Sequence, residues 1–280
     1  MLPLLSSLLS VLPLKVVYGM SYLLGFIAYK ILRIRRSLIL KNLDIAFPDK
    51  YTKIEKDEIG FNSVVSFIFT ELELLASKNG KLSESVTFAN SHVLTDILKR
   101  GQGAYVLCIH IASWEACAAA VNRKIGRAHL IVKKVGGVKT DAFVRKIRED
   151  NGFLSIKREK KGDAYRAIGD IIGRGEIVGF VMDQARPGEP ELPFFGRPAK
   201  TNTSFSGIWK KIPAPIVPCW SRRTEIGKYE VFFGEEIHPV VTGNDKEDNI
   251  TQSLQFNRVV EDMIRQCPSQ YFWLHNRWKL

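Results

Sequence analysis

One stretch near the middle of the chain constrains the fold more than any other, because an apolar run changes there abruptly into helix-forming sequence. Ala104 to Ile109 is apolar, as expected of a short strand buried in a sheet. From Ser113 the sequence turns to Trp, Glu and small residues, which indicates a helix with Ser113 as its N-cap. His110 falls between the two elements, and Glu115 falls in the first helical turn. The stretch therefore predicts a strand–turn–helix unit with two titratable side chains at its turn.

His110 and Glu115 are five residues apart, which is the wrong spacing for one helix face. Five helical steps leave two side chains about 140° apart. The two can meet only if His110 lies outside the helix and the turn folds it back over the helix start. In that arrangement Glu115 holds one imidazole nitrogen and leaves the other free as a base. The plainer alternative is a turn histidine followed by an ordinary first-turn acid.

Strands and helices alternate on both sides of this unit, which favours an α/β domain with a mixed, largely parallel sheet flanked by helices. Strands are expected at Val86 to Ala89, Ala104 to Ile109, His129 to Val132, Phe153 to Ile156, Ile177 to Met182 and after Pro213. A capping box of Thr52 and Glu55 predicts a helix that extends to about Lys78. Further helices are expected from Ser113 and at His92 to Arg100, Lys139 to Asp150, Asp163 to Ile172 and Asp248 to Gln266.

The segment after Met182 contains three prolines and a glycine between positions 186 and 193, which predicts a loop without regular structure. In doubly wound sheets, ligands bind outside the carboxyl ends of the strands. His110 and Asp183 both follow predicted strands, so one cleft can contain both.

The N-terminus is the most hydrophobic part of the chain. Leu2 to Tyr29 is apolar or small except for Lys15, and a basic cluster from Lys30 to Arg36 follows. The stretch is long enough to cross a bilayer, but Pro3, Pro13 and the lysine divide it. Three alternatives remain: one tilted span, an interfacial hairpin in one leaflet, or a hydrophobic helix packed on the domain. No positive region precedes it and no cleavage site follows it, which argues against a cleaved signal peptide.

We therefore divide the chain into a membrane anchor with its basic cluster, residues 1–45, and an α/β domain, residues 46–280. The basic cluster is expected to face the cytoplasm, where anionic headgroups attract it. Deletion of the apolar stretch and the cluster is expected to release the protein from the membrane.

The net charge of +12 indicates an anionic partner. Residues 121–174 alone contain 15 Lys and Arg against 6 Asp and Glu, a net charge of +9. The sequence contains no helix-turn-helix pattern, RNA-binding aromatic motif or zinc-finger spacing, so nucleic acid is not the expected partner. The four cysteines have no metal-binding spacing, which predicts free thiols in a reducing compartment and no metal site.

Five motifs recur in an order and spacing that resemble a known family. They are Asn42-Leu with Phe47-Pro48, His110-x4-Glu115, Met182-Asp-Gln184, Phe194-Phe-Gly-Arg-Pro198 and the segment Pro268 to Lys279. Together they resemble the bacterial late acyltransferases of lipid A biosynthesis, the lauroyl and myristoyl acyltransferases, within the lysophospholipid acyltransferase superfamily. The resemblance implies a glycerol-phosphate-acyltransferase-like α/β fold. It also implies transfer of a fatty acyl chain from acyl carrier protein or acyl-CoA to a hydroxyl of a membrane glycolipid, here a lipid A precursor.

The resemblance also implies roles for single residues. His110 corresponds to the general base and Glu115 to its partner, while Arg148 falls where the family has an essential arginine. Further substrate contacts are implied for Asp183, Gln184 and Arg197. One departure stands out, since Ile-Ala-Ser-Trp follows His110 where the wider family commonly has Phe-Gly-Asn-Trp.

The expected partners are acyl carrier protein or acyl-CoA, an anionic glycolipid acceptor and a membrane surface. We expect no cofactor beyond the acyl thioester, and a catalytic domain on the cytoplasmic side of the inner membrane. Two alternatives stay open: an acyltransferase for another phospholipid or glycolipid, and a membrane-associated thioesterase or esterase. No G-x-S-x-G motif supports a serine hydrolase.

Overall fold

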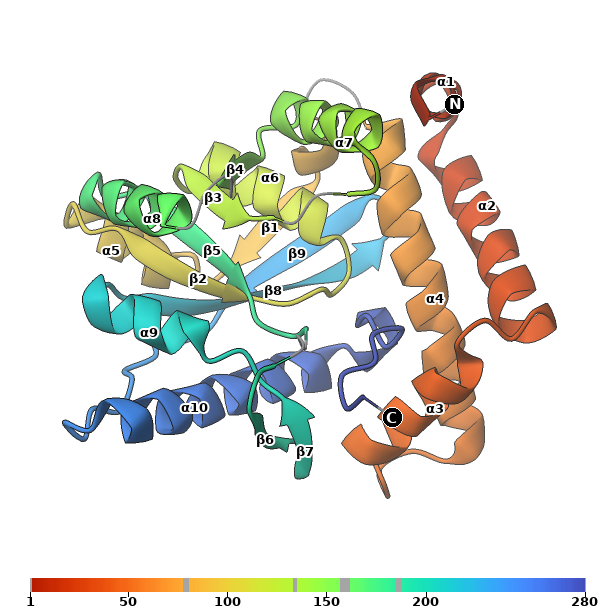
Figure 1. Ribbon diagram of the computed structural model, residues 1–280. Helices are drawn as coiled ribbons and strands as arrows, with labels where there is room; N and C mark the ends of the chain where they lie inside the picture. The colour runs from red at the N-terminus through yellow and green to blue at the C-terminus, as the bar shows by residue number, and fades with distance from the viewer. Residues whose placement is uncertain (1, 78–80, 133–134, 157–161, 185–187, 280) are drawn as a thin grey trace.

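A seven-stranded sheet forms the centre of the protein (Figure 1). The computed structural model describes residues 2–77, 81–132, 135–156, 162–184 and 188–279. The strands are β1 (Val86–Ala89), β2 (Ala104–Cys108), β3 (Ala128–Ile131), β4 (Leu154–Ile156), β5 (Ile177–Val181), β8 (Ile216–Glu225) and β9 (Lys228–Phe233). Their order is β1-β9-β8-β2-β5-β3-β4, and each neighbouring pair is parallel except β8 with β9. The mixed, largely parallel sheet is confirmed.

Helices cover both faces of the sheet (Figure 1). One face carries α5 (His92–Lys99), α6 (Trp114–Lys124) and α7 (Val138–Asp150), and the other carries α8 (Asp163–Gly173), α9 (Ser204–Lys211) and α10 (Asp245–Gln266). On β2, Ala104 and Val106 face the first group, while Tyr105 and Leu107 face the second. Because β2 is buried on both faces, its sequence is a continuous apolar run and not an alternating one.

The long helix α4 (Lys53–Ala76) stands at the edge of this three-layer domain and contributes to the cores on both faces. Its predicted capping box is confirmed, since the Thr52 hydroxyl accepts from the Glu55 N–H and the Glu55 carboxylate accepts from the Thr52 N–H. Phe61 and Val64 join the core under α10, and Leu74 joins the core under α6. The expected end of this helix, Lys78, lies outside the described residues.

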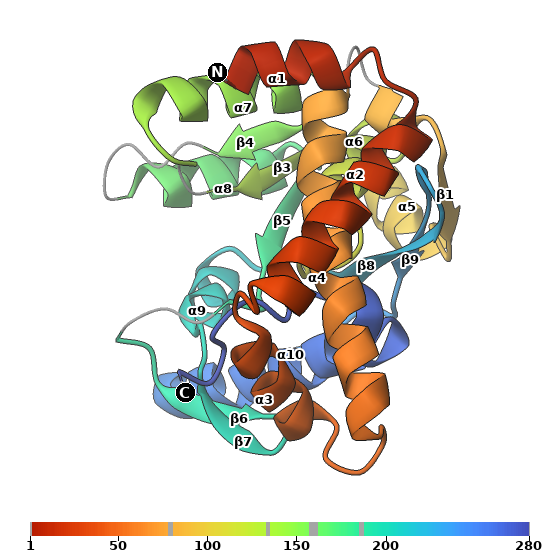
Figure 2. The same ribbon diagram turned by 90° about the vertical axis from the view of Figure 1, so that its right-hand side faces the viewer.

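The N-terminal apolar stretch forms two helices that lie against α4 (Figure 2). They are α1 (Leu2–Leu9) and α2 (Leu14–Phe26), and α2 continues as a turn of π-helix, Ile27–Ile31. The expected break at Pro13 is confirmed, whereas Pro3 lies within α1 and Lys15 within α2. By length and composition alone, Leu14–Ile31 and α4 could each cross a membrane, but α4 is mostly buried in the protein.

The anchor and the α/β domain share one hydrophobic core. Tyr29 and two residues of α3 (Arg36–Ala46), Ile39 and Leu43, pack in the same cluster as Trp273 near the C-terminus. Asn42 of α3 donates to the backbone carbonyls of Trp273 and His275. The domain boundary expected at residue 45 therefore separates residues that belong to one continuous hydrophobic core.

The loop prediction after Met182 is wrong from Glu191 onward. Residues 191–200 form a small antiparallel hairpin of β6 (Glu191–Phe194) and β7 (Arg197–Lys200). Pro193 and Pro198 face each other in its register. A two-stranded ribbon has only edge strands, where a residue without an N–H is tolerated. The strand β9 was also not predicted.

Candidate active site

His110 is held by the carboxylate of Asp183. Its backbone N–H donates to Asp183 Oδ2 at 2.9 Å, and its ring Nδ1 lies 2.8 Å from Asp183 Oδ1. The β2–β5 register explains the contact, because Cys108 lies opposite Val181 and each site residue follows two positions later. With Nδ1 engaged, Nε2 makes no hydrogen bond to any residue that the structure describes.

The surroundings of the two side chains lower the pKa of Asp183 and raise the pKa of His110. Burial lowers the pKa of His110, but the charge of Asp183 and its hydrogen bond outweigh burial, so the pKa lies above the ordinary value. Burial raises the pKa of Asp183, but the charge and hydrogen bonds of His110 hold it below its usual range. Asp183 is 1% exposed. A buried carboxylate bonded to Nδ1 fixes the tautomer in which Nε2 accepts a proton.

Glu115 does not contact the imidazole as the sequence suggested. Its carboxylate accepts from Arg148 Nε at 3.0 and 3.1 Å and from Arg148 Nη2, and it also accepts from Trp114 Nε1 at 3.3 Å. Arg148 comes from the last turn of α7 and lies over the ring of Phe153. The expected His110–Glu115 contact is thus corrected to two separate pairs. The charge of Glu115 still contributes to the raised pKa of His110.

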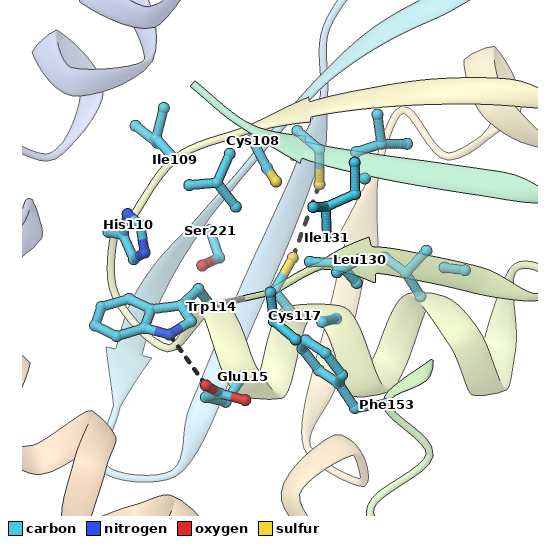
Figure 3. Close-up of a pocket in the computed structure, with 18 of the residues that line it drawn as sticks. Cys108, Ile109, His110, Trp114, Glu115, Cys117, Leu130, Ile131, Phe153 and Ser221 are labelled. Carbon is cyan, nitrogen blue, oxygen red and sulfur yellow. Dashed lines mark hydrogen bonds between the residues drawn. The ribbon is translucent and has the colours of Figure 1, made fainter. Parts of the chain in front are cut away.

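His110, Glu115 and Arg148 line a cavity of about 270 Å³ between α6 and strands β2, β3, β5 and β8, whereas Asp183 is not among the described residues that line it. Figure 3 shows His110 and Glu115 at this cavity. His110, Trp114, Glu115, Arg148 and Gln184 form its polar end. The remaining wall is almost entirely apolar and extends along the strands toward their amino ends; it includes Val106, Cys108, Cys117, Ala118, Val121, Ala128, Leu130, Ile131, Phe153, Ile177, Gly179, Val181 and Cys219.

The other predicted site residues have different positions. Gln184 lines the cavity, with its Nε2 3.5 Å from His110 Nδ1. Arg197 is exposed on the β6–β7 hairpin and is not among the described residues that line the cavity. Among the described residues, no group of three His, Cys, Asp or Glu side chains is arranged to hold a metal ion. All four cysteines are free thiols, as predicted.

The C-terminal segment contributes site residues whose positions the sequence did not reveal. The Phe272 N–H donates to the His110 carbonyl at 3.1 Å, and the two rings lie 5.9 Å apart. Ile111 forms an antiparallel bridge with Tyr271. This segment was recognised as a family motif, but its aromatic residues gave no signal that they pack on the turn after β2.

Comparison with known proteins decides the family. The sequence profile of the bacterial lipid A biosynthesis acyltransferases matches residues 4–280. The chain belongs to this family. The lipid A biosynthesis palmitoleoyltransferase of Escherichia coli (strain K12) is 23% identical to it over 283 residues, which cover 96% of this chain and 86% of the relative. The lipid A biosynthesis lauroyltransferase of the same strain is 22% identical over 275 residues, covering 96% and 87%. A lipid A biosynthesis acyltransferase of Shigella flexneri is also 23% identical, with the same coverage as the palmitoleoyltransferase.

The turn that departs from the common family pattern places Ala112 in a left-handed backbone conformation. Ala112 has φ of +50°, a conformation that glycine adopts freely and alanine adopts at a cost. Two contacts hold it: Thr70 Oγ1 donates to the Ala112 carbonyl at 2.7 Å, and the Ala112 N–H donates to the Gln270 carbonyl at 3.0 Å. Neighbouring contacts therefore fix a turn that glycine would adopt without help.

Ser113 is the N-cap of α6, as predicted. Its Oγ accepts from the Ala116 N–H at 3.4 Å and donates to Glu73 of α4 at 2.9 Å. Tyr229 of β9 donates to the same carboxylate. The turn between β2 and α6 is thus bonded to α4 on one side and to the C-terminal segment on the other.

Proposed function

We propose that this acyltransferase moves a fatty acyl chain from an acyl thioester to a hydroxyl of a lipid A precursor, with His110 as the general base. The observation that carries the proposal is that His110, paired with Asp183, lines the polar end of an otherwise apolar cavity. A base of near-neutral pKa suits deprotonation of an attacking hydroxyl. An apolar cavity beside it suits the hydrocarbon chain of the donor.

The reaction balances with the residues present. His110 Nε2 takes the proton of the acceptor hydroxyl as its oxygen bonds to the thioester carbonyl carbon. The tetrahedral intermediate then collapses, the C–S bond breaks, and the imidazolium returns its proton to the leaving thiolate. Asp183 stabilises the imidazolium between these steps, as a carboxylate does in hydrolase triads.

The negative charge on the intermediate needs hydrogen-bond donors. The N–H groups of Trp114 and Glu115, at the start of α6, have no hydrogen-bond partner among the described residues. The first N–H groups of a helix favour an anion. We assign them as donors, with Arg148 as a second source of positive charge that Glu115 keeps in place.

Two side chains near the base could in principle carry the acyl group covalently, and both are poorly suited. Burial raises the pKa of the Cys108 thiol, so it is a weak nucleophile. Ser113 Oγ is occupied by Glu73 and by the Ala116 N–H. These contacts support direct attack by the acceptor.

We further propose acyl carrier protein or acyl-CoA as the donor and the cytoplasmic side of the inner membrane as the location. The basic region, residues 121–174, suits an acidic carrier protein or the phosphates of CoA. Six of its cations, Lys133, Lys134, Lys157, Arg158, Lys160 and Lys161, lie outside the described residues. The free thiols support a reducing compartment.

The test is acyl transfer by purified enzyme in detergent, with acyl carrier protein thioester and a lipid A precursor, read by mass spectrometry. We expect the acceptor to gain one acyl chain. His110→Ala should lower the rate about 10²–10⁴-fold. His129→Ala is the matched control, because His129 also bonds a carboxylate, Glu176 at 2.8 Å, but does not line the cavity.

Two results would contradict the proposal. An active His110→Ala enzyme would remove the general base. Release of free fatty acid without any acylated acceptor would make the enzyme a thioesterase, which uses the same base to activate water.

A further inference from the structure

The outer side of α1 and α2 is an exposed apolar face. Leu4 of α1, Val11 in the connection between the helices and Leu23 of α2 are 77%, 73% and 59% exposed, and further apolar side chains of both helices are exposed. Both helices lie on the same side of the molecule, which faces the viewer in Figure 2. We call this surface the outer face of α1 and α2. Contiguous apolar surface of this kind marks a contact site and not an ordinary solvated helix.

The opposite side of α2 is fixed to the folded domain. Val17, Ser21, Gly25 and Tyr29 recur every fourth residue and are buried against α4. Gly25 lies so close to Val65 that a Cβ there would come within 2.7 Å of the valine methyl. This is a tight helix–helix contact, so α2 cannot separate from α4 without losing it.

Both ends of α2 contact the same domain, which limits how the helix can meet a bilayer. At its start, Leu14 packs on Gly227 in the turn between β8 and β9. At its far end, Lys30 forms an ion pair with Asp57 of α4 at 2.5 Å. The 18 residues from Leu14 to Ile31 measure about 27 Å, close to the roughly 30 Å thickness of the hydrocarbon core. If α2 crossed the bilayer, one rigid domain would have to reach both sides.

The charges around this face complement an anionic surface. The first 43 residues contain 6 Lys and Arg and no Asp or Glu. Lys15 lies near the start of α2, and Arg33 and Arg35 follow its end; all three are exposed. Cations on both flanks of an apolar helix face suit anionic lipid headgroups.

We propose that α1 and α2 dock the protein on one leaflet of an anionic bilayer, lying along the membrane and not across it. The outer face enters the boundary between headgroups and acyl chains, while Lys15, Arg33 and Arg35 contact the headgroups. α4 and the α/β domain stay on the aqueous side. Of the three alternatives that the sequence left open, this selects the interfacial one.

Flotation with vesicles of equal parts phosphatidylcholine and phosphatidylglycerol tests the contact surface. The full-length protein should float with the vesicles, and the Leu8→Asp/Leu23→Asp variant should bind at least about tenfold less, since both changes place a charge in the apolar boundary. The matched control is Val240→Asp/Val241→Asp, which adds the same charge at exposed valines of another loop. Equal flotation of the two double variants would overturn the proposal.

Activity in detergent separates this proposal from the proposed reaction. The Leu8→Asp/Leu23→Asp enzyme should keep its rate on detergent-dispersed acceptor, because neither residue lines the cavity. That result would also show that the variant folds. Loss of activity in detergent together with loss of binding would overturn the assignment of the outer face as a membrane contact alone.

Depth measurements separate a helix along the membrane from one across it. A spin-labelled amino acid is introduced singly at Val11, Leu23 and Ile31, all exposed in the structure, and its depth in vesicles is measured with aqueous and lipid-soluble relaxation agents. Docking along the leaflet predicts similar depths of about 5–10 Å at all three positions. A span predicts that Leu23 lies near the midplane, about 15 Å deep, with the other two near opposite surfaces, and this result would overturn the proposal.

Discussion

At the level of single residues, the activity should depend on the proton that His110 carries. The base is active only when Nε2 is unprotonated. Because Asp183 raises the pKa of His110 above its ordinary value, the imidazole stays protonated to a higher pH than a free histidine. We expect the acidic limb of kcat/KM to have its midpoint above about 6.5.

Asp183→Asn should shift that midpoint to lower pH and also reduce the maximal rate, since it removes the charge that raises the pKa and stabilises the imidazolium. The measurement is a pH–rate profile of both enzymes, with Asp262→Asn on the exposed side of α10 as a control. A profile that keeps its midpoint in Asp183→Asn would contradict this role for Asp183.

The position of His110 at the end of a strand could be predicted from the sequence, but the partner of its imidazole could not. His110 ends an apolar run, a local signal. Asp183 was placed in the same cleft because both residues follow strands, yet their bond depends on β2 lying next to β5 in one register. That register is set by packing between segments 73 residues apart. Glu115 was the nearer carboxylate in sequence, but Arg148, which reaches it from α7, provides its bonds.

At the level of elements, the cavity between α6 and the sheet should set the length of the acyl chain. Along β5 the wall extends from Ile177 to Val181, about 13 Å for four strand steps. An extended alkyl chain advances roughly 1.25 Å per C–C bond, so the cavity suits a chain on the order of ten carbon atoms.

Substitutions at two depths of α6 should change that preference in opposite directions. Ala118 lies one turn into the helix and Val121 lies a further turn in, and both line the cavity. Ala118→Leu should favour shorter donors and Val121→Ala longer ones, measured by competition among acyl carrier protein thioesters of different chain lengths. Each variant serves as the control for the other; identical shifts in both would show that the cavity does not hold the chain.

Elements with strong local signals were predicted closely, whereas the pairing of the irregular segments was not. The capping box at Thr52 and the N-cap at Ser113 both form as expected. The β6–β7 hairpin was missed because prolines 193 and 198 argue against a strand, although a two-stranded ribbon tolerates them. A proline argues against a strand in the centre of a sheet, but it does not exclude an edge strand.

At the level of the whole molecule, the N-terminal helices are part of the fold and not a detachable anchor. α2 covers Val65 and Phe69 of α4, which are 3% and 0% exposed. Exposing each such side chain costs roughly 1.5–3 kcal/mol, against a total stability of about 5–15 kcal/mol. The sequence predicts that deletion through Arg36 releases the protein from the membrane; the shared core adds that the remaining chain loses packing partners.

We expect the protein lacking residues 1–35 to aggregate or unfold and not to remain as a soluble enzyme. Solubility, circular dichroism and detergent activity of the truncated chain would check this. The Leu8→Asp/Leu23→Asp variant is the control, because it alters only the exposed side of the same helices. A truncated protein that is soluble and active would show that the shared core is dispensable.

α4 contacts both α2 and the turn after β2, and this arrangement has a consequence for the lipid that accepts the acyl chain. One side of this helix carries α2, and Thr70 on another side bonds the turn that follows His110. The thickness of α4, about 10 Å, therefore separates the turn that follows His110 from α2. With α2 on the leaflet as proposed, that thickness is a height built into the fold. An acceptor must therefore carry its hydroxyl on a headgroup that projects to this height, or it must rise partly out of the leaflet. The enzyme would thus select a lipid by how far its headgroup extends above the membrane as well as by its chemistry.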